Sequence, residues 1–471
     1  MEKNKRKTKS KDFVSMPLIN PNAAGIDVGD TTFAVAVPAG RDSVQVKEFT
    51  AFTCDLKSIS QWLSQCCIET VAMESTGVYW KQIFSVLVKD GFEVYLVNAK
   101  HVKNVTGKKD DQSDAMWIQQ LHSCGLLRSC FLPDEHTESL RTLVRFRRNL
   151  INDSSRYILR MQKSLELMNI KVHTVINDIT GKTGTAIIEA IINGERDPKK
   201  FMPYVDKRIK ASKETLLKSL EGNWRKEHLA TLKLSYELYM ILQQKVVECE
   251  KQIEQILSEY SNQNATDENK GEINLNSETN SNLHNTEKKN SLPDKATKKK
   301  QKTKSSPVFE VDSYLKRIYG VDVTQIYGIS QSSALEILAE TGTDLRQWEN
   351  EDKWVSWLNL CPHNKQSGGK LISSTRLKKK PNLATQAFRS AANSLCRSDH
   401  WLGDYFRRMR AKGGQKYAIV ATARKLAIIY YRMIRNKEEF NPVDLKEYQK
   451  QYKAAKISYL ERKLEELKRA A

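Results

Sequence analysis

Apolar and polar positions near the start of the chain follow first a strand pattern and then alternating helix and strand patterns. Two segments, Ala23–Val37 and Ser43–Phe52, are rich in β-branched and apolar residues and predict an antiparallel hairpin. The following segments predict helix, strand, helix and strand, in the order Ile59–Cys67, Thr70–Glu74, Trp80–Lys89 and Glu93–Val97. Antiparallel strands followed by this alternation are typical of a mixed α/β sheet.

From Asp134 onward the apolar spacing becomes that of a long helix. Pro133 and Asp134 are typical of a helix start, and helical periodicity continues from Leu140 to about Asn169. One face of this helix carries the cations Arg141, Arg145, Arg148, Arg156, Arg160 and Lys163. At about 1.5 Å per residue they form a basic ridge about 30 Å long, which favours phosphate contact over an ordinary solvated face.

A second long helix and a polar insert come next. Residues from Leu229 to Tyr260 repeat at three-four spacing, which predicts a coiled-coil-like helix that either self-associates or packs within the monomer. Residues 261–306 contain nine Asn, no aromatic residue and a Lys-rich end, so we expect this insert to be disordered. Tyr314–Phe440 is again globular and mostly helical, and Asp444–Ala471 is a charged helix that buries little surface.

These patterns give a fold class of α/β plus α and divide the chain into six parts. We expect a disordered basic arm at 1–22, an α/β domain at 23–133, a helical, coiled-coil region at 134–260, a disordered Asn/Lys-rich insert at 261–306, a mainly helical domain at 307–440 and a charged helix at 441–471.

The charge of the chain adds a partner to this picture. It has 77 Lys and Arg against 56 Asp and Glu, a net charge of +21, which indicates a polyanion partner; a solvated basic surface is the simpler alternative. The eight Cys include no CxxC pair, which argues against a disulfide framework or a zinc site. The scattered Cys favour a reducing cytoplasm. We see neither the roughly 18 apolar residues that a membrane helix needs nor the apolar stretch of a signal peptide.

Four carboxylates occupy informative positions in the predicted N-terminal domain. Asp27 lies within an apolar strand, where a buried acid is costly unless it is paired or binds a metal. Glu74 ends another apolar strand, and Asp111 and Asp114 begin a helix with the i, i+3 spacing that places both on one face. Oxygen ligands suit Mg²⁺, and two-metal sites need several carboxylates close together. The pattern therefore predicts a Mg²⁺ site that acts on phosphates.

Each of these acids also has a purely structural explanation. Asp27 would fit a turn at a strand end, and Asp111 or Asp114 would fit a helix N-cap. Any one acid alone is more often structural than catalytic, whereas four in this order are much more specific. Two neighbours are set aside, because Asp110 would point away from the shared helix face and Asp30 fits a turn.

A second candidate for chemistry is the run Ser367, Gly368, Gly369 and Lys370. A serine before two glycines can be exposed on a tight turn, where backbone amides approach a phosphate closely. Serine is a poor nucleophile unless a base or a metal activates it. Its use here would be covalent cleavage of a phosphodiester, with the bond energy kept in a phosphoserine link. The motif by itself is more often a flexible loop.

A further motif consists of Tyr327, Gly328, Ile329 and Ser330, ahead of a predicted helix at Ala334–Thr341. It resembles a helix-hairpin-helix, whose amides hold a nucleic-acid phosphate without reading sequence, although a plain helical hairpin explains it almost as well. Together with the basic ridge and the cations that follow Ser367, it suggests a nucleic-acid surface. We predict nucleic-acid contacts at Arg141, Arg145, Arg148, Arg156, Arg160, Lys370, Lys378 and Lys379.

These features together resemble one known family, the insertion-sequence-110 transposases, which are bridge-RNA-guided recombinases and include pilin-gene DNA invertases. The resemblance extends from about Ala24 to about Phe440 and is interrupted by the insert. It rests on GKKDDQSDAMWI around Asp111 and Asp114, on DITGKTGTAIIEAIINGERDP at Asp178–Pro198, and on YGI, LCP, SGGK and the helix at Ala421–Ala427.

The resemblance implies a fold and a mechanism. It implies a RuvC-like domain of RNase H fold at the N-terminus, with the first and fourth strands as neighbours, and a transposase domain at the C-terminus. The family's Asp-Glu-Asp-Asp tetrad, which binds Mg²⁺ with two ions per site, falls on Asp27, Glu74, Asp111 and Asp114. The family's catalytic serine falls on Ser367 and becomes linked to the 5′-phosphate before strand exchange.

The resemblance also implies partners and a location. The partners are target and donor DNA, a structured guide RNA, and further copies of the chain, from a dimer to a tetramer. In such an oligomer a serine from one subunit can complete the metal site of another. The location is the prokaryotic cytoplasm, in association with the nucleoid.

Three other functions stay open at this point. A site-specific DNA invertase of the same family would use the same chemistry on inverted repeats. A RuvC-like junction nuclease would use water, rather than Ser367, as the nucleophile. A catalytically silent nucleic-acid-binding protein is the third, although the presence of all five candidate catalytic residues argues against it.

Overall fold

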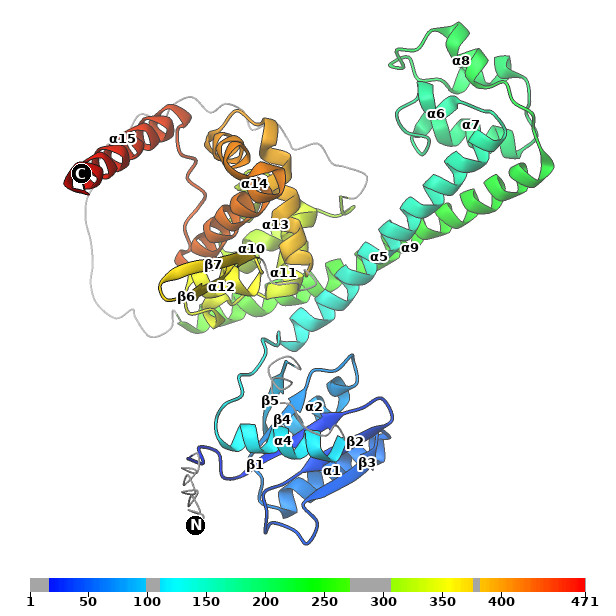
Figure 1. The fold of residues 1–471 in the computed structure, drawn as a ribbon. Helices are drawn as coiled ribbons and strands as arrows, with labels where there is room; N and C mark the ends of the chain where they lie inside the picture. Colours follow the sequence, from blue (N-terminus) through cyan, green and yellow to red (C-terminus); the bar gives the residue numbers. More distant parts are fainter. Residues whose placement is uncertain (1–16, 99–110, 272–305, 376–381, 471) are drawn as a thin grey trace, which may run out of the picture. The chain divides into compact units, whose positions relative to one another are not determined.

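The structure is a computed structural model that describes residues 17–98, 111–271, 306–375 and 382–470. Most of the expected basic arm, residues 272–305 of the expected insert, and Lys378 and Lys379 lie outside the described residues. The chain forms two compact units, one up to Leu132 and one from Pro133 onward, which we describe separately (Figure 1).

A five-stranded mixed sheet with the order β3-β2-β1-β4-β5 forms the centre of the first unit. Its strands are β1 (Ala23–Val28), β2 (Thr32–Ala36), β3 (Val46–Thr50), β4 (Thr70–Glu74) and β5 (Glu93–Val97). The first three strands pair antiparallel in chain order, whereas β4 lies parallel to both β1 and β5. The expected pairing of the first and fourth strands is therefore confirmed.

The first predicted strand segment contains two strands rather than one. β1 and β2 are separated by a tight turn in which the Gly29 amide donates to the Thr32 carbonyl at 3.0 Å. A Cβ at Gly29 would lie 2.6 Å from the same carbonyl oxygen, so only glycine fits this turn. The expected hairpin is thus a three-stranded meander, and this changes which residues share a face of the sheet.

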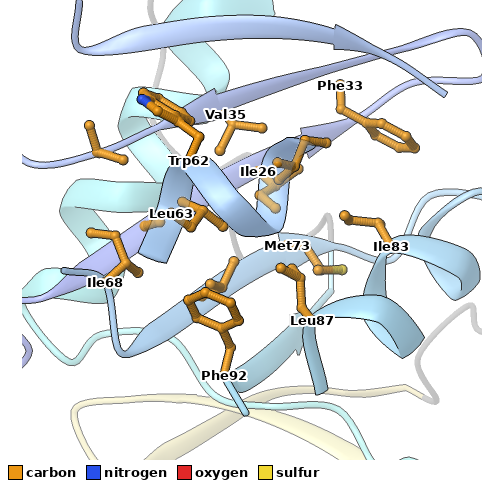
Figure 2. Close-up of a cluster of buried hydrophobic side chains, with 14 of the residues drawn as sticks. Ile26, Phe33, Val35, Trp62, Leu63, Ile68, Met73, Ile83, Leu87 and Phe92 are labelled. Atoms are coloured by element: carbon orange, nitrogen blue, oxygen red, sulfur yellow. The ribbon is translucent and has the colours of Figure 1, made fainter. Parts of the chain in front are cut away.

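Two helices, α1 (Thr53–Gln65) and α2 (Trp80–Lys89), bury one face of the sheet. Figure 2 shows Leu63 of α1 and Leu87 of α2 beside Met73 of β4 in a cluster of buried apolar side chains. Both helices are amphipathic, and their apolar sides meet the β-branched and apolar side chains of the central strands. This cluster is the core of the first unit.

The opposite face of the sheet is covered by α4 (Asp111–Ser123). The helix approaches β1 so closely that a Cβ on Gly25 would lie 2.3 Å from the backbone nitrogen of Gln119. Side chains alternate between the two faces of a strand, so Asp27 shares the α4 face with Gly25. The small residue at 25 therefore lets α4 approach the strand that carries the first candidate acid.

Two long helices of the second unit pack side by side: α5 (Glu135–Leu167) and α9 (Lys226–Gly271) (Figure 1). Arg147 in the first half of α5 pairs with Glu250 in the second half of α9, at 2.7 Å. Near the other end, the hydroxyls of Ser164 and Thr231 are 3.1 Å apart, so the helices are antiparallel. The coiled-coil-like helix therefore packs within the monomer, which is one of its two expected outcomes.

A small helical module joins α5 to α9. It consists of α6 (Val172–Val175), α7 (Lys182–Ile192), the short helix η1 (Pro198–Tyr204) and α8 (Lys213–Ser219). Ile187 and Phe201 are fully buried in its core together with Leu232 of α9. The motif segment Asp178–Pro198 therefore forms much of this module.

The C-terminal part of the second unit is mainly helical and contains one β-hairpin. Its elements are α10 (Val311–Tyr319), η2 (Val323–Gln325), α11 (Gln331–Thr341), η3 (Leu345–Gln347), α12 (Glu351–Trp357), β6 (His363–Ser367), β7 (Lys370–Thr375), α13 (Leu383–Ser394), η4 (Leu395–Arg397), α14 (Trp401–Asn436) and α15 (Leu445–Ala470). The core contains the fully buried Trp354, whose indole N–H donates to the Ala427 carbonyl at 2.9 Å. The fold class of α/β plus α is confirmed.

Two of the polar segments are helical, and one of them differs from expectation. α9 continues to Gly271, so residues 261–271 of the expected insert are helical; the helix carries on past Tyr260 and Ser261, which are both buried. α15 is exposed along nearly all of its described length, as expected of a charged helix. In the part of the chain that the structure describes, no helix is both long and apolar enough to cross a membrane.

Candidate active site

A cavity of about 280 Å³ opens on the α4 face of the sheet, where β1 and β4 end and α4 begins. Asp27, Glu74 and Asp114 all line it. The register explains the first two: Ile26 lies beside Met73 in the parallel pair, so the next residues, Asp27 and Glu74, are neighbours on one face. The structure thus brings together three of the four predicted acids from three separate elements.

The fourth predicted acid, Asp111, is the first residue of α4. Its backbone is described and its side chain is not. Asp114 follows it after three residues, the spacing at which two residues share a helix face. Of the two acids set aside, Asp110 lies outside the described residues, and Asp30 is in the turn after β1 and does not line the cavity.

The carboxylate of Glu74 has a partner that sequence reasoning missed. The Thr76 hydroxyl donates to Oε1 of Glu74 at 2.8 Å, and Thr76 lines the same cavity. Glu74 is only 8% exposed, so this hydrogen bond helps to keep a nearly buried carboxylate in one orientation. A hydroxyl residue two positions after an acid at a strand end was the available signal.

Another unpredicted residue of the cavity is Glu48, in the edge strand β3. Ala34 of β2 lies opposite Asp27 on one side and opposite Glu48 on the other. Directly paired residues point to the same face, so these three side chains form one row across the sheet. No local sequence signal marks Glu48, because finding it requires the registers of two strand pairs.

The donor atoms of the cavity suit a hard divalent cation, because its polar lining consists of carboxylates, hydroxyls and backbone groups. Among the described residues, no three His, Cys, Asp or Glu side chains converge closely enough to enclose a metal ion by themselves. Mg²⁺ does not need such a cage, since it keeps several waters and binds through one or two carboxylates plus substrate phosphate. An open, acidic cavity therefore fits Mg²⁺ better than a metal that prefers a closed protein shell.

Ser367 is the last residue of β6, at the tip of the β6–β7 hairpin, and it pairs with Lys370 across the turn. Gly368 and Gly369 form this turn with φ of +56° and +74°. Positive φ at both central residues matches the type I′ turn, which favours glycine. Ser367 is exposed, and no described residue forms a hydrogen bond with its hydroxyl. The prediction of a serine exposed on a tight turn is confirmed.

The Tyr327–Ser330 motif has mainly structural contacts. Gly328 has a φ of +85°, and a Cβ there would lie 2.7 Å from the Ala391 carbonyl oxygen. Tyr327 stacks on the His400 ring at 4.0 Å, and the Ser330 side chain caps α11 by accepting from the Ser333 amide. Close packing and capping account for these residues of the motif, and phosphate binding by its backbone amides stays a prediction.

In the first half of the predicted basic ridge on α5, the arginines contact α11. Arg141 donates to the carbonyls of Ala339 and Glu340 at 3.1 and 2.7 Å, and burial lowers the pKa of its guanidinium. Arg145 forms two hydrogen bonds with the Glu340 carboxylate, both at 2.8 Å. Both arginines therefore join α5 to α11. Arg141 is largely buried, whereas the side chain of Arg145 is 52% exposed, and its contact with nucleic acid stays a prediction.

Arg148 continues the same joint, because it donates to Glu336 of α11 at 2.7 Å. Burial raises the pKa of the Glu336 carboxyl. Farther along α5, Arg156 and Arg160 are exposed, as is Lys370 on the hairpin. Nucleic-acid contact stays a prediction at these three residues and at Arg148, whose side chain is 42% exposed. The partner acids on α11 could not be inferred from the periodicity of α5 alone.

Comparison with known families agrees with both candidate centres. Residues 24–170 match the DEDD transposase model of the IS110 family, and residues 322–407 match a model described as the transposase IS116/IS110/IS902 family. The first span contains the acids of the cavity, and the second contains the Ser367 hairpin. A search of the curated proteins found no match. The chain belongs to the IS110 family of transposases.

Proposed function

We propose that this transposase is an RNA-guided DNA recombinase that depends on Mg²⁺ and uses Ser367 as its nucleophile. The observation that carries the proposal is the shared cavity of Asp27, Glu74 and Asp114 inside the span that matches the DEDD transposase model. Three acids from separate segments of the chain line one cavity on a single face of the sheet, and such a set of oxygen ligands suits Mg²⁺.

The carboxylates of Asp27, Glu74, Asp111 and Asp114 would hold the metal. Bound Mg²⁺ supplies polarisation of the scissile phosphate and stabilises charge on the attacking and leaving oxygens. The protein contributes rigidity, because two of these acids stand on central strands and two on one helix. The Thr76 hydroxyl adds to this by fixing the orientation of Glu74.

Ser367 performs the covalent step in this proposal. Its Oγ attacks the scissile phosphorus and loses its proton, the bond from phosphorus to the 3′ oxygen breaks, and that oxygen takes up a proton. The products are a 5′-phosphoserine and a free 3′-hydroxyl, and attack by the 3′-hydroxyl of another strand reverses the step and releases the serine. The exposed turn supports this role, since a side chain at a hairpin tip is accessible to a DNA backbone.

The last part of the proposal is a guide RNA that selects the DNA sequence. The excess of cations, with a net charge of +21, favours binding to nucleic-acid backbones rather than recognition of particular bases. Base pairing with an RNA would then supply sequence specificity, and the protein would hold backbones and shape. The exposed Arg156, Arg160 and Lys370 are the described residues that we expect to contribute.

The decisive test measures DNA recombination in cells by the wild type and by Asp27→Ala, Glu74→Ala, Asp114→Ala and Ser367→Ala variants. We expect each variant to lose at least 100-fold in activity, because each removes a metal ligand or the nucleophile. A denaturing gel of the wild type should show a covalent protein–DNA adduct that Ser367→Ala abolishes. Asp30→Asn and Ser374→Ala are matched controls beside the cavity and in the hairpin, and both should stay active.

The other outcomes separate the alternatives. Cleavage retained by Ser367→Ala would identify a junction nuclease that uses water and would refute the covalent step. RNA should co-purify with the wild type, and normal recombination by nuclease-treated, RNA-free protein would contradict the guide. An invertible segment between inverted repeats beside the gene would favour the invertase over the mobile element.

A further inference from the structure

The row across the sheet adds Glu48 as a fourth carboxylate to the described lining of the cavity. Asp27 and Glu48 are both paired with Ala34, one on each side of β2. Neighbouring strands are about 4.8 Å apart, so the backbones of the two acids are separated by about 10 Å. Ala34 between them carries only a methyl group, and it lines the cavity together with both acids.

Side chains of β3 alternate between the two faces of the sheet, and this alternation places Glu48 on the cavity face. Its neighbour Phe49 points to the α1 face, where its ring centroid is 5.7 Å from that of Trp62. Val46, two residues before Glu48, packs with Ala115 of α4 on the other face. Glu48 therefore belongs to the α4 face, and it lies on the exposed rim of the cavity rather than in the core.

A simpler role for Glu48 would be to keep the edge strand β3 from pairing with other chains. Charge on either face of β3 would serve that purpose, and Lys47 already supplies one on the opposite face, where it pairs with Asp42 at 2.7 Å. Protection of the edge thus does not explain why the acid stands in the row of Asp27.

We propose that Glu48 is a positioning residue for the divalent cation of this cavity, and the inference rests on the metal site of the proposed function. Mg²⁺ keeps several waters when it binds to proteins, and their hydrogens need acceptors on the cavity wall. Asp27 and Glu74 occupy the central strands, and Glu48 supplies a charged acceptor on the β3 side. It therefore binds metal-held water and adds negative charge without being one of the tetrad acids.

The test measures Mn²⁺ binding to the full chain without DNA, by the loss of the electron paramagnetic resonance signal of free Mn²⁺. Removal of an outer partner of a metal site typically weakens metal binding by about 10- to 100-fold. We expect Glu48→Gln to raise the Mn²⁺ dissociation constant about tenfold and Glu48→Asp to restore part of the loss. Asp30→Asn removes a nearby charge outside the cavity and should change the constant by less than about twofold.

The outcomes distinguish the inference from the proposed function. If the wild type binds no Mn²⁺, or if Asp27→Asn binds it as well as the wild type, the metal site itself is refuted. If Asp27→Asn loses binding while Glu48→Gln binds like the wild type, only the role of Glu48 is overturned. An equal effect of Asp30→Asn and Glu48→Gln would assign the change to net charge and would also overturn it. Circular dichroism melts of each variant show whether it is folded, and if Glu48→Gln does not fold, Glu48→Asp decides the question alone.

Discussion

At the scale of single residues, two consecutive glycines determine how the candidate nucleophile is presented. Gly368 and Gly369 both have positive φ, and the turn they form ends the strand that carries Ser367. No described atom lies within 4 Å of a Cβ built at either glycine. Steric space therefore does not require glycine at this turn. The positive φ angles of the backbone do.

Substitution of Gly368 tests this constraint. A β-branched residue at a φ of +56° is strained by about 1–2 kcal/mol or more, so Gly368→Val should reduce the protein–DNA adduct at least tenfold. Gly368→Asn should keep most of the adduct, because Asn tolerates positive φ and Asn-Gly suits a type I′ turn. Adduct bands on denaturing gels measure the effect, and equal yields from the two variants would contradict it.

At the scale of elements, the α5–α11 joint shows what a helical periodicity leaves out. The spacing of Arg141, Arg145 and Arg148 placed them correctly on one face of one helix. What the face contacts was decided by two acids of α11, Glu336 and Glu340, which lie far away in the sequence. The carboxylates of α11 therefore neutralise part of this cationic face, and Arg141 is largely buried in the joint.

Removal of Glu340 should therefore destabilise the second unit. Glu340 is 2% exposed, and without it the largely buried Arg141 loses its carboxylate partner. Breaking a buried pair in this way typically lowers the free energy of unfolding by about 3–5 kcal/mol, so Glu340→Ala should unfold at clearly lower urea concentration. Glu349→Ala, at an exposed position of the same unit, should change it by less than about 0.5 kcal/mol. Coincident urea curves for the two variants would show that the joint carries no stability.

At the scale of the whole molecule, local elements could be predicted and distant pairings could not. Thr70–Glu74 and Glu93–Val97 have the predicted bounds because each is a short apolar run between turn residues. Ser367 was predictable because two glycines after it mark a turn. Glu48 joins the acids only through the registers of β1–β2 and β2–β3, and Arg141 meets a residue 199 positions away. Such pairings depend on the tertiary fold, and the periodicity of apolar residues in the sequence does not predict them.

Acid should destabilise the assembled chain through its buried histidines. His122 of α4 is 1% exposed and lies 2.9 Å from the Thr70 hydroxyl of β4. Burial lowers its pKa from 6.5 to about 4. The unfolded chain therefore takes up a proton near pH 6.5, whereas the folded chain resists protonation until about pH 4. Stability is full above pH 6.5 and falls as the pH drops toward 4, by about 3 kcal/mol for this one group.

Thermal melts of the wild type and His122→Gln between pH 4 and 7 measure this contribution. The wild type should lose more stability than the variant across this window, because glutamine stays neutral and its amide is placed to bond with Thr70. Burial also lowers the pKa of His400 in the second unit, so part of the acid sensitivity should persist in the variant. Parallel pH curves for the two proteins would mean that His122 is protonated equally in the folded and unfolded chains. In that case the contact between His122 of α4 and Thr70 of β4, at the end of β4 away from the candidate metal cavity, would be accessible to protons in the folded chain.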